Sequence, residues 1–145
     1  VTWGEVFAIL PFGNRTVIAT YTGAQMKVAL MNGVSPNCDS AIHTGRTPQL
    51  SGMRITFTCD GTTPVITGMW LTPQGMGGPE TPVTDTTTFR MVINDFVYTG
   101  GDGYTNLIEG TDVLQPGDDL MEIVAAYIGA HSPVSAAVEG RVVKQ

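Results

Sequence analysis

The sequence has few charged residues, few histidines and no long apolar run. Only 14% of its 145 residues are charged. Its longest apolar stretch, residues 123–130, is far shorter than the ~20 residues of a transmembrane helix. No basic and apolar leader opens the sequence, so we expect any signal peptide to be removed or to lie upstream. The net charge of −6 argues against a nucleic-acid polymer as partner, since an acidic chain gains nothing from counterion release.

The motifs of metal and nucleophilic catalysis are also missing. His43 and His131 are isolated, and the spacings H-x-H, H-E-x-x-H and C-x-x-C do not occur. We interpret His131 as the end of a helix and His43 as an exposed loop residue. Asp118 and Asp119 are explained by a helix N-terminus, which favours acidic side chains, and no G-x-S-x-G elbow is present. We therefore predict no metal site and no catalytic residue in this chain.

The chain has two cysteines, Cys38 and Cys59. In a composition rich in threonine and poor in lysine, they favour an exported protein with one disulfide. Two buried free thiols in a cytosolic protein are the alternative. A disulfide here closes a loop of about 20 residues and adds roughly 3 kcal/mol in the chain-entropy model.

Length and apolar content predict one folded domain over residues 1–145, since 42% of the residues are hydrophobic. Two capping-box spacings, Thr2 with Glu5 and Thr22 with Gln25, predict the starts of two helices. Apolar residues spaced for one helical face predict a third; they are Leu120, Ile123, Val124, Tyr127 and Ile128.

Helices and strands alternate without a strict βαβ order, which predicts an α+β fold with a mixed β-sheet and packed helices. Alternating apolar residues, among them Phe89, Met91 and Ile93, indicate half-buried strands. The expected helices cover residues 3–10, 23–33 and 120–131. The expected strands cover residues 15–21, 53–59, 65–71, 87–96 and 138–143.

Residues 94–104 contain the strongest candidate binding pattern. Phe96 is expected at the end of a strand, and Asp102 on a tight turn with Gly100 and Gly101. A carboxylate can accept two hydrogen bonds from a sugar diol, and a ring face matches a flat base. The alternatives are a glycine-rich hairpin with a satisfied Asp102 and a core Phe96, or a cooperating carboxylate pair of Asp95 and Asp102.

A second candidate segment, residues 10–14, holds Phe12 in a turn between Pro11 and Gly13 and ends at Asn14. This is an unusual place for a core residue, which suggests a binding role. The alternative is a hydrophobic staple that closes the first helix.

Taken together, these segments resemble the C-terminal domain of the 5'-nucleotidase/UDP-sugar hydrolase family. The resemblance covers essentially the whole chain, and its most specific part is the pairing of P-F-G-N with N-x-F-x3-G-G-D-G-Y. The matching stretches, in family order, are residues 2–5, 10–14, 22–23, 48–52, 94–96, 100–104 and 138–141.

The resemblance implies a role for each motif residue. Two phenylalanines of the family sandwich the base, which falls on Phe12 and Phe96. An asparagine contacts the base edge, which falls on Asn14, and the aspartate of the G-G-D-G turn holds the ribose hydroxyls, which falls on Asp102. The chain would thus be the nucleoside-recognition domain of a secreted, periplasmic or cell-surface 5'-nucleotidase that hydrolyses nucleoside 5'-phosphates.

The resemblance also implies parts that this sequence does not contain. The family's substrate-contacting N-G-G-x-R segment would precede Val1. Two divalent metal ions would be held by an N-terminal metallophosphoesterase domain, the partner of this one. We therefore interpret Val1 as an internal boundary of a longer protein and expect the chain alone to bind nucleosides without hydrolysing nucleotides. The alternative is a non-catalytic extracellular binding or adhesion module.

Overall fold

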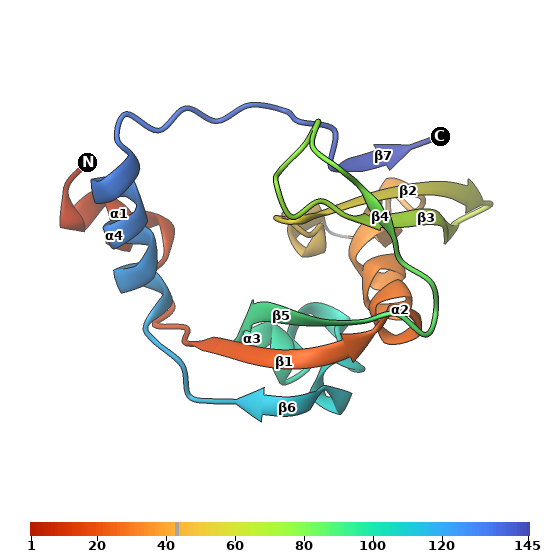
Figure 1. The fold of residues 1–145 in the computed structure, drawn as a ribbon, viewed down its shortest axis with the longest axis horizontal. Helices are drawn as coiled ribbons and strands as arrows, with labels where there is room; N and C mark the ends of the chain where they lie inside the picture. Colours follow the sequence, from red (N-terminus) through yellow and green to blue (C-terminus); the bar gives the residue numbers. More distant parts are fainter. Residues whose placement is uncertain (43) are drawn as a thin grey trace.

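The computed structural model describes residues 1–42 and 44–145, so the expectation for His43 lies outside the described residues. The strands of the described part form two sheets in the orders β5–β1–β6 and β4–β3–β2–β7. Helix α2 lies between them (Figure 1). This arrangement confirms the α+β prediction for a single small domain. The strands are β1 (Thr16–Thr22), β2 (Met53–Asp60), β3 (Thr63–Leu71), β4 (Thr81–Pro82), β5 (Thr88–Asn94), β6 (Thr111–Leu114) and β7 (Val142–Lys144).

Both predicted capping boxes are present. In α1 (Trp3–Ile9) the Thr2 amide donates to Glu5 Oε2 at 2.6 Å, and the Glu5 amide donates to Thr2 Oγ1. In α2 (Gly23–Val34) the same reciprocal bonds join Thr22 and Gln25. Each threonine is extended where the helix begins, so both helix starts follow from local sequence.

The core forms where α2 packs between the two sheets. The best-buried large side chains of the core include Tyr21 of β1, Leu30 of α2 and Phe57 of β2. The Tyr21 hydroxyl donates to the Leu107 carbonyl oxygen at 2.7 Å, which satisfies both groups inside the core. The cluster also includes Ala19, Met26, Ala29, Val34, Met53, Ile55, Ile66, Met69 and Tyr104.

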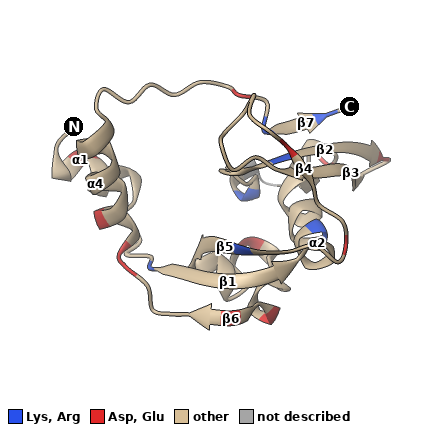
Figure 2. Ribbon diagram, viewed as in Figure 1, with Lys and Arg blue, Asp and Glu red and all other residues tan. Residues whose placement is uncertain are grey.

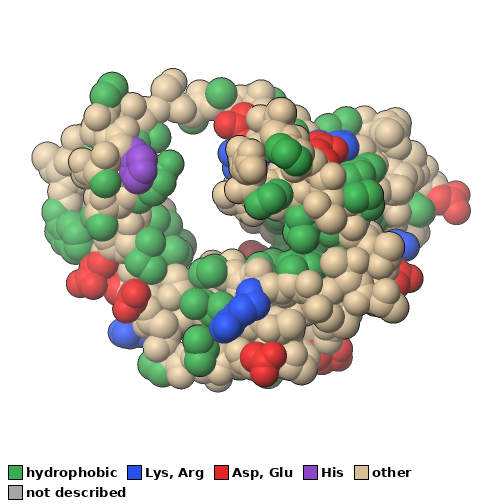
Figure 3. All heavy atoms as spheres, viewed as in Figure 1, with side chains coloured by type: hydrophobic (Ala, Val, Ile, Leu, Met, Phe, Trp, Pro, Cys, Tyr) green, Lys and Arg blue, Asp and Glu red, His purple; other side chains and the backbone are tan. Residues whose placement is uncertain are grey.

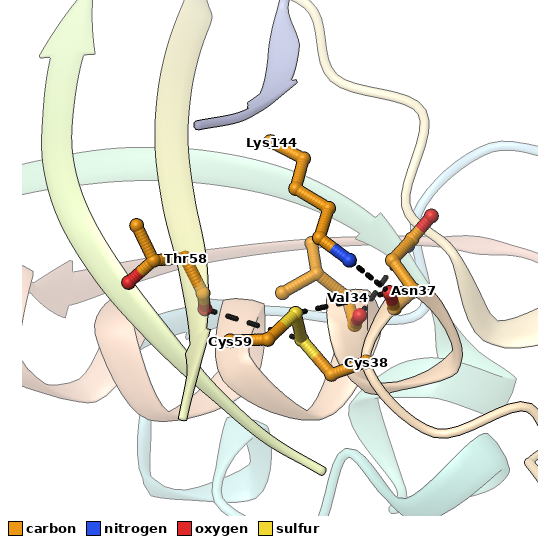
Figure 4. The surroundings of a disulfide bond; sticks show 6 residues. All are labelled: Val34, Asn37, Cys38, Thr58, Cys59 and Lys144. Atoms are coloured by element: carbon orange, nitrogen blue, oxygen red, sulfur yellow. Dashed lines mark hydrogen bonds between the residues drawn. A yellow bond between two sulfur atoms is a disulfide. The ribbon is translucent and has the colours of Figure 1, made fainter. Parts of the chain in front are cut away.

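The predicted disulfide joins Cys38, after α2, to Cys59 near the end of β2 (Figure 4). Beside it, the Lys144 ammonium donates to the Asn37 carbonyl oxygen at 2.8 Å. The disulfide and this bond tie the loop after α2 to strands β2 and β7 of one sheet.

The third predicted helix forms as α4 (Leu120–His131), but its apolar face is not in the core. None of its residues is buried, and Ile123 and Tyr127 are 40% and 56% exposed. The helix packs beside α1 at a distance from α2 (Figure 1). Figure 3 shows hydrophobic side chains gathered over this pair and an open gap between it and the sheets.

Two strand predictions need correction, and two further strands were not predicted. The strand expected over residues 87–96 ends at Asn94, because the Asn94 side chain accepts from the Val97 amide at 2.8 Å and caps α3 (Asp95–Tyr98). The strand expected over residues 138–143 is β7, residues 142–144, which pairs in parallel with β2. Strands β4 and β6 were not predicted; they pair with β3 and β1.

Charged residues are spread over the described part of the chain and do not gather in one patch (Figure 2). One pair is well formed: Arg54 of β2 makes two hydrogen bonds of 2.7 Å to the Glu80 carboxylate, and its guanidinium lies 4.0 Å from the centre of the Trp70 ring. No helix among the described residues is both long and apolar enough to cross a membrane.

Candidate functional site

A hydrogen bond between two distant segments defines the site. Asn14 Nδ2 donates to Asp95 Oδ1 at 3.0 Å, across 81 residues of sequence. Phe12 stands two residues before Asn14, and Phe96 follows Asp95 directly. Because two residues span at most about 7 Å of backbone, the bond brings both candidate aromatic segments to one region of the surface.

Both phenylalanines are exposed to solvent. Phe12 is 82% exposed in the turn after α1, and Phe96 is 49% exposed on α3. The first value excludes a hydrophobic staple at Phe12, and the second excludes Phe96 as a core residue. Phe96 lies on a short helix, not at a strand end, because Asn94 begins that helix.

Gly101 lies directly against the ring of Phe96. A Cβ at Gly101 would come within 2.5 Å of ring atoms Cε1 and Cζ, too close for any side chain without a shift of the ring. The preceding Gly100 has φ +100°, which also favours glycine. The glycines of this turn therefore allow one side of the Phe96 ring to lie on the backbone.

The turn holds Asp102 in a left-handed conformation with φ +53°, which aspartate tolerates better than most residues. The Asp102 carbonyl oxygen accepts from Asn32 Nδ2 at 3.0 Å, and Arg46 donates to Asn32 Oδ1 at 3.2 Å. The Asp102 carboxylate is exposed and accepts no hydrogen bond from the described residues. The backbone of this turn is thus held in place by hydrogen bonds. Beside Phe96 it carries a carboxylate that accepts no hydrogen bond from the described residues.

Two ionisable groups of the site have shifted pKa values. The hydrogen bond from Asn14, helped by the amides of Arg15 and Phe96, lowers the pKa of Asp95 against the opposing effect of burial. Burial, together with the nearby Asp102 carboxylate, raises the pKa of Tyr104 to about 12. Tyr104 donates to the Arg46 carbonyl oxygen at 2.7 Å and is buried, so it supports the turn from beneath.

The remaining acidic candidates have structural roles. Asp95 Oδ1 accepts three hydrogen bonds, so Asp95 is not available as a general acid. Asp119 caps α4 by accepting from the amides of Met121 and Glu122. His131 is the last residue of α4 and stacks on Tyr127 with ring centres 4.2 Å apart.

No group of three or more His, Cys, Asp or Glu residues within residues 1–42 and 44–145 is arranged to hold a metal ion. The carboxylates named above are spread over α3, the glycine turn and α4, and Asp95 and Asp119 are already engaged as acceptors. The donor set of the described residues therefore does not fit a two-metal centre.

Sequence reasoning missed two contributors to the site, Asn32 and the structural role of Asp95. No local sequence pattern indicates the role of Asn32, because its hydrogen-bond partner, Asp102, lies 70 residues away. A signal near Asp95 was present: Asn followed by Asp is typical of a helix N-terminus, and it correctly marks the start of α3.

Comparison with known proteins shows which family the chain resembles. The family model described as "5'-nucleotidase, C-terminal domain" matches residues 1–109. The trifunctional nucleotide phosphoesterase protein YfkN of Bacillus subtilis is 33% identical over 98% of this chain, and the cell wall protein Lmo0130 of Listeria monocytogenes is 28% identical over 97%. The matches cover 10% and 17% of those two proteins.

Among solved structures, the 5'-nucleotidase precursor from Thermus thermophilus superposes on 99% of this chain with a TM-score of 0.82 and 33% identity. The matched part is 28% of that protein. The chain thus spans between a tenth and about three tenths of the length of these relatives.

Proposed function

Because this chain belongs to the 5'-nucleotidase C-terminal domain family, we propose that it recognises the nucleoside part of a nucleotide substrate. In this proposal the base stacks between Phe12 and Phe96, Asn14 contacts the base edge, and Asp102 accepts hydrogen bonds from the ribose hydroxyls. Gly100 and Gly101 form the turn that presents Asp102 and let the Phe96 ring lie against its backbone.

One observation carries the proposal: two exposed aromatic rings stand on segments that are tied together, beside an exposed carboxylate on a fixed turn. Exposed aromatic faces bind bases with little regard to sequence, at about 1–3 kcal/mol per stacked base. A carboxylate without a protein partner can accept two hydrogen bonds from a diol. The two features together fit a nucleoside better than a base or a sugar alone.

For the whole protein, we propose a secreted or surface 5'-nucleotidase that hydrolyses nucleoside 5'-phosphates. An N-terminal domain with two divalent metal ions would supply the water that attacks phosphorus, and this domain would position the substrate. The disulfide and a relative named as a cell wall protein support an extracellular location. The relatives do not favour the alternative of a non-catalytic adhesion module.

The test is an NMR titration of this chain with adenosine up to several millimolar. We expect saturable shifts in the wild type and at least ~5-fold weaker binding in Phe12→Ala and in Phe96→Ala, from the loss of one stacked face. Phe7→Ala is the matched control, because Phe7 is 54% exposed on α1 and is not among the proposed ligand contacts. Absence of saturable shifts, or equal losses in all three variants, would contradict the proposal.

A further inference from the structure

We propose that Asp95 is a positioning residue of the nucleoside site, which fixes the Phe12 turn against α3 and sets the orientation of the Asn14 amide. This inference rests on the proposed function and adds to it a residue that is not expected to touch the ligand. Phe12 and Phe96 belong to segments far apart in sequence, so a preformed aromatic pair needs a direct link between those segments.

Asp95 provides that link through a single oxygen atom. Its Oδ1 accepts from Asn14 Nδ2 at 3.0 Å, from the Arg15 amide at 3.2 Å and from the Phe96 amide at 2.9 Å. Two of these donors belong to the segment after Phe12 and the third belongs to Phe96 itself. Movement of either segment would therefore break a hydrogen bond to the same carboxylate.

The backbone completes this link. The Asp95 amide donates to the Arg15 carbonyl oxygen at 2.9 Å, so Arg15 and Asp95 are joined in both directions. On the other side, the Asn14 carbonyl oxygen accepts from the Leu120 amide at 3.0 Å. Asn14 thus has one group held by α3 and another held by the first residue of α4.

The carboxylate also decides which atom Asn14 can offer a ligand. An ionised carboxylate accepts hydrogen bonds but cannot donate them, so the NH2 group of the Asn14 amide must face Asp95. The lowered pKa of Asp95 keeps the carboxylate ionised at neutral pH. Asn14 Oδ1 is therefore the amide atom that can contact a ligand. It is an acceptor suited to an N–H donor on the base.

A conservative and a truncating substitution at position 95 test this inference. In Asp95→Asn, the side-chain carbonyl oxygen can take the place of Oδ1 and accept from the same three donors, so a neutral acceptor keeps the link and the orientation of the Asn14 amide. Asp95→Ala removes all three side-chain hydrogen bonds and leaves the backbone bond to the Arg15 carbonyl oxygen.

The measurement is the adenosine affinity of these variants by NMR, with hydrogen exchange of the Arg15 amide as a readout that needs no ligand. We expect Asp95→Ala to bind ~10-fold more weakly, as the loss of a hydrogen bond to a charged group implies, and its Arg15 amide to exchange faster. Asp95→Asn should stay within ~3-fold of the wild type, because it keeps an acceptor in the same place. Thermal unfolding of each variant shows that the fold is intact.

Two outcomes would overturn the inference by itself: wild-type affinity in Asp95→Ala, or an Asp95→Asn variant that binds as weakly as Asp95→Ala. A wild-type chain that does not bind adenosine would overturn the proposed function, and this inference with it. The wild-type titration therefore separates the two failures.

Discussion

The ring of Phe96 occupies the space that a side chain at Gly101 would fill, with ring atoms 2.5 Å from the position of the missing Cβ. An alanine at Gly101 must therefore push the ring away from the turn. We expect Gly101→Ala to weaken adenosine binding by ~10-fold, because the displaced ring loses its stacking geometry. Adenosine titration by NMR measures the change.

Gly129→Ala is the matched control for this substitution. Gly129 lies in α4 with no atom within 4 Å of a built Cβ, so alanine fits without displacement. We expect unchanged adenosine affinity and a gain of about 0.5–1 kcal/mol in the free energy of unfolding. Equal adenosine affinities in the Gly101 and Gly129 variants would show that the position of the Phe96 ring does not matter.

The proposed role of Asp102 predicts that this chain distinguishes ligands by their ribose hydroxyls. If its carboxylate binds the diol, the wild type should prefer adenosine to 2',3'-dideoxyadenosine by roughly 10-fold or more. Asp102→Gly removes the carboxylate, and glycine adopts the observed φ of +53° without strain. This variant should bind both compounds equally, and competition between them by NMR is the readout. A variant that still prefers adenosine would place the diol elsewhere.

The disulfide predicts a loss of stability without a loss of recognition. It closes a loop with a sequence separation of 21 residues, so Cys38→Ala with Cys59→Ala should lower the free energy of unfolding by about 3 kcal/mol. The bond ties α2 to β2, whereas the aromatic segments lie on the turn after α1 and on α3. Adenosine affinity should stay unchanged in conditions where the variant is folded. Urea unfolding and titration of the same sample measure both quantities.

The Arg54–Glu80 pair predicts a pH dependence of stability. The two hydrogen bonds from Arg54 lower the pKa of Glu80 below its ordinary value of 4.5. A carboxyl group with a lowered folded-state pKa stabilises the fold above its unfolded pKa and loses that contribution as pH falls through the folded value. Glu80→Gln should thus be less stable than the wild type at pH 7, with a gap that narrows toward pH 3. Urea unfolding across this range is the measurement, and a gap independent of pH would contradict it.

Features that depend on neighbouring residues could be predicted from the sequence. The helix starts at Thr2 and Thr22 were correct because a capping box is complete within four residues. The alternation of Phe89, Met91 and Ile93 correctly indicated β5 but did not indicate where the strand ends. Asn94 ends it, because its side chain caps α3 although the strand periodicity continues past that residue. Local pattern and local cap gave opposite answers, and the cap determined the structure.

Features that depend on distant partners could not be predicted in this way. Strand β6 forms because Thr111 and Leu114 pair with Thr20 and Ile18 of β1. Nothing in the sequence of its four residues indicates a strand. The periodicity of α4 correctly indicated a helix but not that this helix packs beside α1, away from the core. The link between Asn14 and Asp95 is of the same kind. The candidate ligand residues could be predicted from sequence motifs. The residues that hold them in place could be identified only from the fold.

In the proposed site, one base lies between Phe12 and Phe96. Intermolecular NOEs measure it most directly, from the adenine H2 and H8 protons to the ring protons of this chain at a saturating concentration of adenosine. The account predicts NOEs to both rings, lost at the substituted ring in each alanine variant and unchanged in Phe7→Ala. Saturable binding with NOEs to only one of the two rings, or to aromatic residues elsewhere, would contradict it.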